Sequence, residues 1–337
     1  MDIDIVLDSH LSSQELTDLG LLAERYGIRT VWNASYLDGR DPFTNMAQLA
    51  RESSQICVAP MALNGYEMHP FRITMALLTL NELAPGRVKT MIGGGGEVVM
   101  GLKIPFEKRV RYVRECLEFV KGATTERPFN YDGELFKIEN YNPQWPTATK
   151  PPFVYAGANK PQMLRMAAKV ADGIFMSDLS VNLATTCIND ALGYRKAAGL
   201  ESDAFRFNNF MAWYVYDDPA EARFEARRWI GFRALFRDYM MKEFVTDAEF
   251  QVLLAHMPEI YAMAPKNTDR VAGVPDELLD RCVDRLTLTG GTNDLDRIIE
   301  HLLEFKAIGV TDICLELKNH QAHGIKLLGE RVIPLLR

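Results

Sequence analysis

Four consecutive glycines, Gly93–Gly96, stand out as residues whose type and spacing could serve chemistry. They follow an apolar run at 87–92, and Glu97 comes directly after them. Glycine lets the backbone approach a flat ligand closely and leaves its N–H groups accessible. A tight turn needs only one glycine, so the run favours a ligand-binding loop with Glu97 at its edge. The run lacks the G-x-G-x-x-G spacing of a dinucleotide fingerprint.

A second loop with this potential lies at 155–161 (YAGANKP), between an apolar run and a helical pattern. Free N–H groups and the helix dipole at a helix N-terminus attract anions, and Lys160 adds a positive charge. Gly157, Ala158 and Asn159 could therefore hold a phosphate group. A plain strand-to-helix connection explains these residues equally well.

A third segment, 60–70 (PMALNGYEMHP), ends another apolar run. Asn64 and Gly65 permit an unusual backbone path, because both residue types tolerate turn conformations that others avoid. His69 stands just before a predicted helix. A lone histidine in such a place more often donates a hydrogen bond within its loop than acts as an acid or base.

Several other kinds of chemistry are excluded by missing motifs. The sequence has no H-E-x-x-H, Walker or G-x-S-x-G motif, which argues against zinc-protease, P-loop and α/β-hydrolase chemistry. His320 and His323 lack a third ligand nearby, and we predict no metal site. The five cysteines form no C-x-x-C pair and are typical of reduced thiols in a core.

The charge balance narrows the choice of partner. The formal net charge is −7 and no basic stripe offsets it, which argues against nucleic acid and against an anionic membrane surface. The N-terminus lacks the features of a signal peptide, and no apolar run is long enough to span a membrane. We therefore expect a soluble cytoplasmic protein that acts on small molecules.

Strands and helices alternate along most of the 337 residues. Apolar runs without polar alternation predict strands buried on both faces, as in a parallel sheet covered by helices. Eight such runs lie at 3–7, 29–33, 56–63, 87–92, 153–157, 173–176, 207–216 and 312–317. They most simply close into a (β/α)8 TIM barrel, an α/β fold that we expect to form one domain over 1–337. An open, doubly wound sheet is the alternative.

Two stretches interrupt this alternation. Residues 123–152 carry five prolines and read as an irregular excursion. Residues 219–285 read as a helical insertion before the last strand, with aromatic residues at helical spacing. Packing against the barrel or a subunit partner explains that aromatic stripe more simply than a substrate lid does.

The three loops described first all lie at the C-terminal ends of predicted strands. In an α/β barrel this end carries the active site. The other polar residues expected there are Asp8, Asn33, Tyr36 and Asp178.

Several segments share motifs with a known family. The most specific is V-Y-A-G-A-N-K-P-x-M-L-x-x-A-A-K-V-A-D-G at 154–173. M-H-P-F at 68–71, L-N-E-L-A-P-G-R-V at 80–88 and R-x-x-Y-V-R-E-x-L-E-F-V at 109–120 also match, and 288–294 matches more weakly. Together they resemble the bacterial luciferase-like superfamily of flavin- and deazaflavin-dependent oxidoreductases. The likeness is strongest to methylenetetrahydromethanopterin reductase-type members.

This resemblance implies a barrel whose C-terminal end holds FMN or the 8-hydroxy-5-deazaflavin coenzyme F-420, in a homodimer. The ring would lie over the ends of the third and fourth strands, and the phosphate side would reach the loop after the fifth. The implied coenzyme contacts are Met61, Ala62, Leu63, Asn64, Gly93, Gly94, Gly95, Gly157, Ala158 and Asn159. Many relatives have a non-prolyl cis peptide in the third strand, which would be Met61–Ala62 here.

The chain departs from the family pattern at the second strand. Many relatives carry an Asp-His pair there, whereas residues 32–37 of this chain contain neither an acid nor a histidine. Glu97 is therefore our first choice of catalytic acid, with Tyr36 and Asp8 as further catalytic candidates. The predicted function is hydride transfer between the coenzyme and a small organic substrate. The alternatives are FMN-dependent monooxygenation and a non-catalytic flavin-binding barrel.

Overall fold

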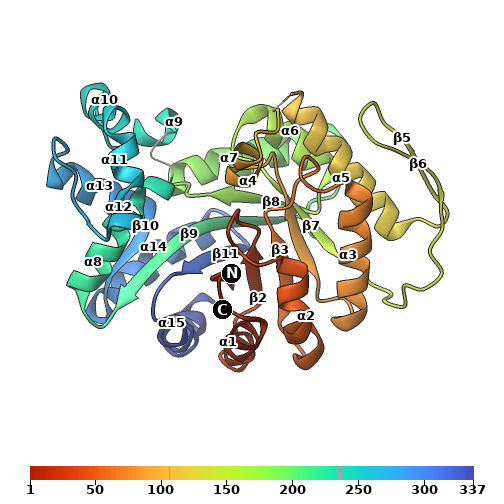
Figure 1. Cartoon of the computed structure of the whole chain (residues 1–337), viewed down its shortest axis with the longest axis horizontal. Coiled ribbons are helices and arrows are strands. Elements are labelled where there is room, and N and C mark those ends of the chain that lie inside the picture. The colour runs from red at the N-terminus through yellow and green to blue at the C-terminus, as the bar shows by residue number, and fades with distance from the viewer. Residues whose placement is uncertain (106, 234–236) are drawn as a thin grey trace.

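A computed structural model describes residues 1–105, 107–233 and 237–337, without the side chain of Glu97 (Figure 1). Eight parallel strands form the centre of the molecule. They are β1 (Asp2–Leu7), β2 (Thr30–Ala34), β3 (Cys57–Met61), β4 (Lys89–Ile92), β7 (Phe153–Gly157), β8 (Gly173–Ser177), β9 (Arg206–Tyr216) and β11 (Asp312–Leu317). Their order is β3-β2-β1-β11-β9-β8-β7-β4, and the bridges Val58–Val88 and Leu63–Ile92 join β3 to β4. This nearly closed barrel confirms the predicted fold over the open sheet.

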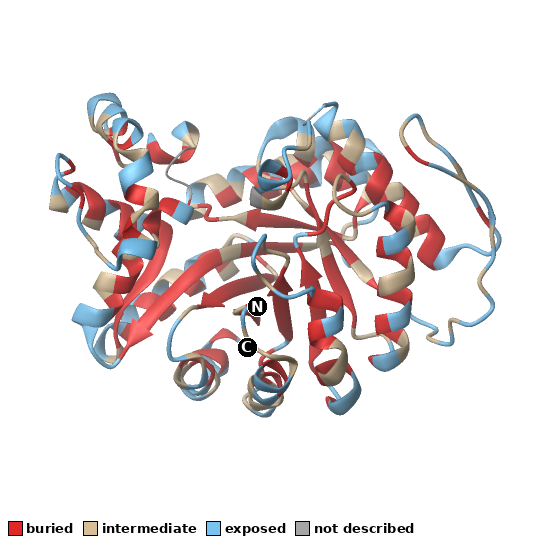
Figure 2. Ribbon diagram, viewed as in Figure 1, coloured by how far each residue is buried: buried red, intermediate tan, exposed pale blue. Residues whose placement is uncertain are grey.

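Helices cover the outside of the barrel. Figure 2 shows that the strands are buried almost throughout, while each outer helix is buried along its inner face. The covering helices are α1 (Ser13–Arg25), α2 (Pro42–Glu52), α3 (Pro70–Leu83), α5 (Arg109–Thr125), α6 (Pro161–Val170), α7 (Val181–Ala197), α14 (Leu295–Ala307) and α15 (Gln321–Leu327). Proline opens α2, α3 and α6, where its missing N–H costs no helical hydrogen bond.

The predicted insertion is helical, but a strand follows it that the sequence analysis missed. The insertion contains α8 (Pro219–Arg228), η1 (Ile230–Phe232), α9 (Asp238–Met241), α10 (Asp247–Ala255), α11 (Met257–Tyr261), α12 (Met263–Lys266) and α13 (Asp276–Leu286). The missed strand, β10 (Thr287–Gly291), pairs with Ala212–Tyr216 of β9. On the same edge of β9, β8 pairs with the first half of the strand, Arg206–Phe210. The outer half of the long β9 therefore has a free edge, which β10 fills.

The expected irregular excursion at 123–152 contains a hairpin. α5 runs to Thr125, and β5 (Phe129–Asp132) then pairs antiparallel with β6 (Lys137–Tyr141). Phe129 and Phe136 are buried, so the hairpin packs through its aromatic residues. The remaining short elements are α4 (Glu97–Gly101), η3 (Thr292–Asp294), η4 (Leu328–Val332) and α16 (Ile333–Leu336).

A buried charged network fills the N-terminal end of the barrel. Lys89 Nζ lies 3.8 Å from Asp4 Oδ2 and 3.7 Å from Asp312 Oδ1. Arg206 donates two hydrogen bonds to Asp312, from Nε at 2.8 Å and from Nη2 at 2.7 Å. Trp32 Nε1 donates to Asp4 Oδ2 at 2.9 Å. This end of a barrel serves stability, because the active site of the fold lies at the other end.

The five cysteines are all free and buried, as predicted. Burial raises the pKa of the Cys116 thiol, and no charged neighbour opposes that shift. In the part of the chain that the structure describes, no helix is long and apolar enough to cross a membrane.

Candidate active site

The C-terminal ends of the strands bring most of the predicted site residues to one face of the barrel, which we call the mouth. At β3 the bond Met61–Ala62 is cis, which confirms the prediction for that bond. Between the two bridges to β4, five steps along β3 oppose four along β4, so β3 carries one extra residue as in a β-bulge. Ala62 is exposed at this bulge, whereas Met61 and Leu63 are buried.

The bulge is joined directly to the start of the glycine run. Leu63 N–H donates to Met91 O at 2.9 Å, and Gly93 N–H donates to Leu63 O at 2.9 Å. Asn64 is buried, and its Oδ1 accepts the N–H groups of Tyr66 and Glu67 at 3.0 Å each. The Asn64 side chain thus holds the loop in place, and a contact of this residue with a coenzyme remains a prediction.

The fold itself explains only part of the glycine run. Gly95 has φ +76°, a conformation that favours glycine. Among the described residues, a Cβ added to Gly96 would meet nothing within 4 Å, and one added to Gly93 would lie 3.6 Å from Met91 Sδ. Packing therefore does not require glycine at these two positions. Their lack of side chains leaves room for a ligand at the mouth.

Gly157 lies beside this run on the neighbouring strand. A Cβ at Gly157 would lie 3.1 Å from Met91 Sδ and 3.6 Å from the Cα of Gly93. The two predicted binding loops are therefore adjacent, and they line one arc of the mouth together with the β3 bulge. We call this arc, formed by 61–63, 93–96 and 157–159, the glycine arc.

The loop after β7 opens a helix whose N-terminus has no side-chain cap. Ala158 N–H donates to Phe175 O at 3.1 Å, and the amide of Asn159 both donates to and accepts from the backbone of Ser177. Lys160, the N-cap of α6, makes no capping hydrogen bond, and its Nζ lies 5.3 Å from the centre of the Tyr239 ring. Arg237 Nη1 donates to Ser177 O at 3.3 Å. Two cationic side chains thus lie near this helix terminus.

A buried ion cluster that the sequence analysis did not predict joins the C-terminal ends of β8 and β11. Arg233, from the insertion, donates from Nη2 to Glu316 Oε2 at 2.8 Å, and its Nη1 lies 3.4 Å from Asp178 Oδ1. Lys318 Nζ lies 3.1 Å from Glu316 Oε1. A second acid in the strand 312–317, at its C-terminal end and four residues after Asp312, was a usable signal for Glu316. Nothing in the sequence pattern indicated that Arg233 reaches the barrel.

Two residues named from the sequence belong to this mouth cluster. Tyr36 OH donates to Glu316 Oε1 at 3.5 Å. Asp178 is buried, and burial raises its pKa although Arg233 and Arg237 oppose that shift. Burial would also raise the pKa of Glu316, but Lys318 and Arg233 outweigh it and hold that pKa at about 2. Glu316 therefore carries a permanent negative charge at the mouth.

The other predicted polar residues have separate surroundings. Asp8 is half-buried, and its Oδ1 accepts from His10 N–H at 2.9 Å and lies 2.7 Å from His10 Nδ1. Asn33 is fully buried and donates to Leu7 O at 3.4 Å, so it holds β2 to β1 rather than facing the mouth. The backbone of Glu97 begins α4, but its side chain lies outside the described structure.

Glu67 is an acidic residue at the mouth that sequence reasoning missed. It is half-buried, and its Oε2 is buried without a hydrogen-bond partner among the described residues. Burial raises the pKa of this carboxyl, while the side chains of Asn64 and Ser35 counteract part of the shift. Its place three residues after Asn64, in the turn-forming segment 60–70, was the available signal.

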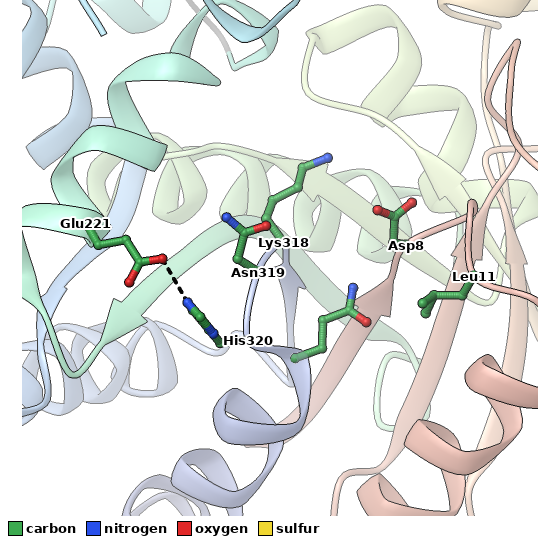
Figure 3. Close-up of a pocket in the computed structure, with 7 residues that line it drawn as sticks. Asp8, Leu11, Glu221, Lys318, Asn319 and His320 are labelled. Atoms are coloured by element: carbon green, nitrogen blue, oxygen red, sulfur yellow. Dashed lines mark hydrogen bonds and ion pairs between the residues drawn. The ribbon is translucent and has the colours of Figure 1, made fainter. Parts of the chain in front are cut away.

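A cavity of about 470 Å³ opens at the mouth between β1, β11 and the insertion (Figure 3). It is lined by Asp8, Leu11, Glu221, Lys318, Asn319, His320 and Gln321. Glu221 of α8 meets His320, whose Nε2 lies 2.8 Å from Glu221 Oε1, and Asp8 lies on the far side of the cavity. β1 and β11 stand opposite β4 and β7 in the barrel order, so this cavity lies across the mouth from the glycine arc.

The ion cluster gives the protein an acid-sensitive element. The pKa of Glu316 is about 2 in the folded protein against an ordinary value of 4.5, so its contribution to stability is complete above pH 4.5 and is lost as the pH falls toward 2. We expect Glu316→Gln to lower the free energy of unfolding at pH 7. The difference in unfolding free energy between wild type and this variant should shrink by on the order of 3 kcal/mol from pH 5 to pH 2. Urea unfolding at each pH measures this difference. A constant difference would show that the Glu316 charge is not what stabilises the cluster.

Comparison with known families gives one match that covers most of the chain. The model of the family described as luciferase-like monooxygenase matches residues 4–312. A 5,10-methylenetetrahydromethanopterin reductase from Archaeoglobus fulgidus is 26% identical over 330 residues, which cover 94% of each chain. An F420-dependent glucose-6-phosphate dehydrogenase from Nakamurella multipartita is 25% identical, covering 96% of this chain and 92% of that protein.

Solved structures share the fold at lower identity. The coenzyme F420-dependent tetrahydromethanopterin reductase from Methanopyrus kandleri superposes with a TM-score of 0.83 at 18% identity, covering 100% of this chain and 99% of that one. An FMN-bound Baeyer–Villiger monooxygenase component from Pseudomonas putida gives a TM-score of 0.66 at 17% identity, with 99% and 98% covered. These findings confirm the resemblance drawn from the motifs. F420 and FMN, named for these proteins, are the two coenzymes predicted from the sequence.

Proposed function

The chain belongs to the luciferase-like monooxygenase family and is an oxidoreductase of the flavin or deazaflavin type; we propose that it moves a hydride between coenzyme F420 and a small organic substrate. One observation carries the proposal. The bulged end of β3, the glycine run and Gly157 stand on neighbouring strands, and together they leave an arc of backbone with few side chains.

The glycine arc fits a flat ring. Gly93 and Gly96 have space around them that a side chain could fill, and the glycines leave this space empty. Together with the exposed Ala62 at the bulge, they offer the ring a surface of backbone and one methyl group. When bound, the coenzyme supplies the ring carbon that accepts or gives the hydride. The role of the chain is to hold that ring flat against the arc and to present one of its faces to the substrate.

The loop after β7 fits the anionic end of the coenzyme. The N-terminus of α6 has no side-chain cap, and Lys160 and Arg237 lie beside it. Free N–H groups and positive charge together favour a phosphate. In this proposal Gly157, Ala158 and Asn159 contact the phosphate through their backbone, since the Asn159 side chain is already bound to Ser177.

The proton that accompanies hydride transfer needs an acid or base at the mouth. Glu97 follows the glycine run directly and remains our first choice for this role. Asp8, Tyr36 and the half-buried Glu67 are the next candidates, because each lies in a loop that follows a strand of the mouth.

We expect Glu97→Gln to keep the coenzyme dissociation constant within about twofold of wild type and to lower kcat by roughly 10²–10⁴-fold, the usual effect of losing a general acid or base. Fluorescence titration measures the first quantity and steady-state kinetics the second. An unchanged kcat would move the role to Glu67, Asp8 or Tyr36. A loss of coenzyme affinity would place Glu97 in the ring site instead.

Oxygen dependence separates hydride transfer from the alternative reaction. We expect a panel of alcohols and aldehydes to include one that bleaches or restores the visible absorbance of F420 in the complete absence of oxygen. Turnover that occurs only with FMN and oxygen would instead identify a monooxygenase. A coenzyme that binds but reacts with no member of the panel under either condition would favour the non-catalytic barrel.

We also propose that the protein works in the cytoplasm as a homodimer and as a single folded domain over 1–337. Its net charge of −7 supports small molecules rather than nucleic acids as partners. Exposed apolar side chains near α4, at Leu37, Met100 and Leu102, support a contact with a second subunit.

A further inference from the structure

The hollow across the mouth from the glycine arc is widely open to solvent, and its volume and position suit a small-molecule substrate. Its volume of about 470 Å³ lies within the usual range for small-molecule pockets. Asp8 follows β1, and Lys318–Gln321 follow β11, so its walls come from the ends of two barrel strands. Glu221 adds a wall from the insertion (Figure 3). We call this cavity the β1–β11 pocket.

The three charged side chains that line the β1–β11 pocket, Lys318, Glu221 and Asp8, each already interact with an oppositely charged residue or with a histidine. Lys318 lies 3.1 Å from Glu316, and its Nζ is 4.5 Å from the centre of the Trp229 ring. Glu221 pairs with His320 at 2.8 Å. Asp8 pairs with His10 at 2.7 Å. A charged ligand would have to displace one of these pairs in order to gain an ion pair of its own.

The surroundings also carry an excess of negative charge. Asp8, Glu221 and Glu316 are acids, and Glu316 stays ionised because of Lys318 and Arg233. Arg233, the second cation, is buried between Glu316 and Asp178. An anion entering the pocket would therefore meet more negative than positive charge at short range, which lowers its affinity.

The same groups can still bind hydroxyl groups. The ion pairs of Asp8 and Glu221 use Oδ1 and Oε1, and a carboxylate has a second oxygen that accepts hydrogen bonds. The side-chain amides of Asn319 and Gln321 offer donors and acceptors, and Leu11 is the one apolar side chain of the lining. A wall that both donates and accepts hydrogen bonds, above the apolar stems of its long side chains, suits a ligand with hydroxyl groups on a carbon skeleton.

We propose that the β1–β11 pocket binds the substrate, and that this substrate is a neutral, hydroxyl-bearing molecule of the polyol or sugar class rather than a phosphate ester. This proposal rests on the hydride-transfer function above and names its substrate class. In the oxidising direction, a C–H bond of the bound alcohol breaks with its electron pair passing to the oxidised deazaflavin or flavin. The O–H proton goes to a base at the mouth, and a carbonyl group forms. The coenzyme is reduced by the two electrons that the alcohol loses.

Two matched pairs of ligands test the charge selectivity: glucose with glucose 6-phosphate, and glycerol with glycerol 3-phosphate. Binding to the coenzyme-loaded protein is measured by saturation-transfer NMR and by titration. We expect at least one neutral member to bind, and its phosphate ester to bind at least tenfold more weakly. Tighter binding of the phosphate esters, or no binding of any of the four while the coenzyme remains bound, would overturn the proposal.

A charge reversal in the wall gives a second readout. Glu221→Lys breaks the ion pair with His320 and replaces a charge that repels phosphate with one that attracts it. We therefore expect this variant to reduce or invert the preference for the neutral ligand over its phosphate ester. Glu139→Lys makes the same change on the exposed face of the hairpin strand β6, and we expect it to leave the preference unchanged. Equal effects of the two variants would show that the β1–β11 pocket does not select the ligand.

The coenzyme affinity, measured in the same samples, separates the two possible failures. If neither F420 nor FMN binds the wild-type protein, the proposed function is wrong. If a coenzyme binds and the phosphate ester is the preferred ligand, the function stands and only the substrate class is wrong.

Discussion

Gly157→Val is expected to weaken coenzyme binding by about 100-fold while the barrel stays folded. A Cβ at this position points toward Met91 Sδ at 3.1 Å and toward the backbone of Gly93 at 3.6 Å. Met91 is flexible and can move aside, but the branched side chain then fills the space between the two loops of the glycine arc. Fluorescence titration with F420 and with FMN measures the loss, and circular dichroism and thermal unfolding check the fold.

A matched control replaces a glycine that faces no ligand. Gly193 is exposed on α7, where an added Cβ would meet nothing within 4 Å. Gly193→Val should therefore leave the coenzyme affinity at the wild-type value. A folded Gly157→Val protein with unchanged affinity would remove this loop from the coenzyme site.

Lys89→Met is expected to lower the free energy of unfolding by about 3–5 kcal/mol, because removing one partner leaves buried charge without compensation. Lys89 is buried within 3.8 Å of both Asp4 and Asp312. Asp312 keeps its two hydrogen bonds from Arg206, so Asp4 is the residue that loses its cation. Urea unfolding at pH 7 measures the effect.

The pH dependence of this variant checks the cause. Burial already raises the pKa of Asp4 to about 6 although Lys89 opposes the shift, so the stability that protonated Asp4 provides is lost as the pH rises through 6. Without Lys89 the pKa of Asp4 rises further. The destabilisation should therefore be larger at pH 8 than at pH 5. A pH-independent loss would indicate altered packing rather than an uncompensated carboxylate.

An exposed lysine provides the control for this variant. Lys137 pairs with Asp132 on the surface hairpin, and both side chains are largely exposed. Exposed ion pairs contribute roughly 0–1 kcal/mol, so Lys137→Met should change the unfolding free energy by no more than about 1 kcal/mol. Similar losses at Lys89 and Lys137 would contradict the role assigned to the buried network.

The barrel could be predicted because its strands carry a strong local signal. Apolar runs without alternation marked all eight barrel strands, and proline at 42, 70 and 161 marked helix starts that the structure confirms. The cis bond at Met61–Ala62 was predicted from resemblance and not from the residues themselves. No local propensity of Met or Ala favours a cis peptide bond.

The missed elements depend on contacts between distant parts of the chain. β10 consists of Thr287–Gly291, a short run with two glycines that weakens a strand signal, and it forms because β9 extends past β8. The hairpin at 129–141 is stabilised by burial of Phe129 and Phe136 in a segment whose prolines suggested irregular structure. Neither pairing can be read from one stretch of sequence alone.

The sequence indicated the backbone segments of the glycine arc, and across the mouth it indicated Asp8, Tyr36 and Asp178 but not Arg233 or Glu316. The coenzyme and catalytic roles of these residues remain predictions. Glycines and turn residues show their backbone role in the sequence, which is why the glycine arc was found. Arg233 and Glu316 are 83 residues apart, and they form their ion pair only when the insertion packs against the barrel. Glu67 looked like an ordinary loop acid, and only its burial beside Ser35 and Asn64 distinguishes it.

The most direct test of the proposed function is a titration of coenzyme-free protein with F420 and with FMN, followed by absorbance and fluorescence. We expect saturable binding of F420 with one site per chain, a dissociation constant in the micromolar range or below, and weaker binding of FMN. Binding of neither coenzyme by folded wild-type protein would contradict the assignment of the glycine arc. Clearly tighter binding of FMN would contradict the choice of coenzyme and favour the monooxygenase reaction.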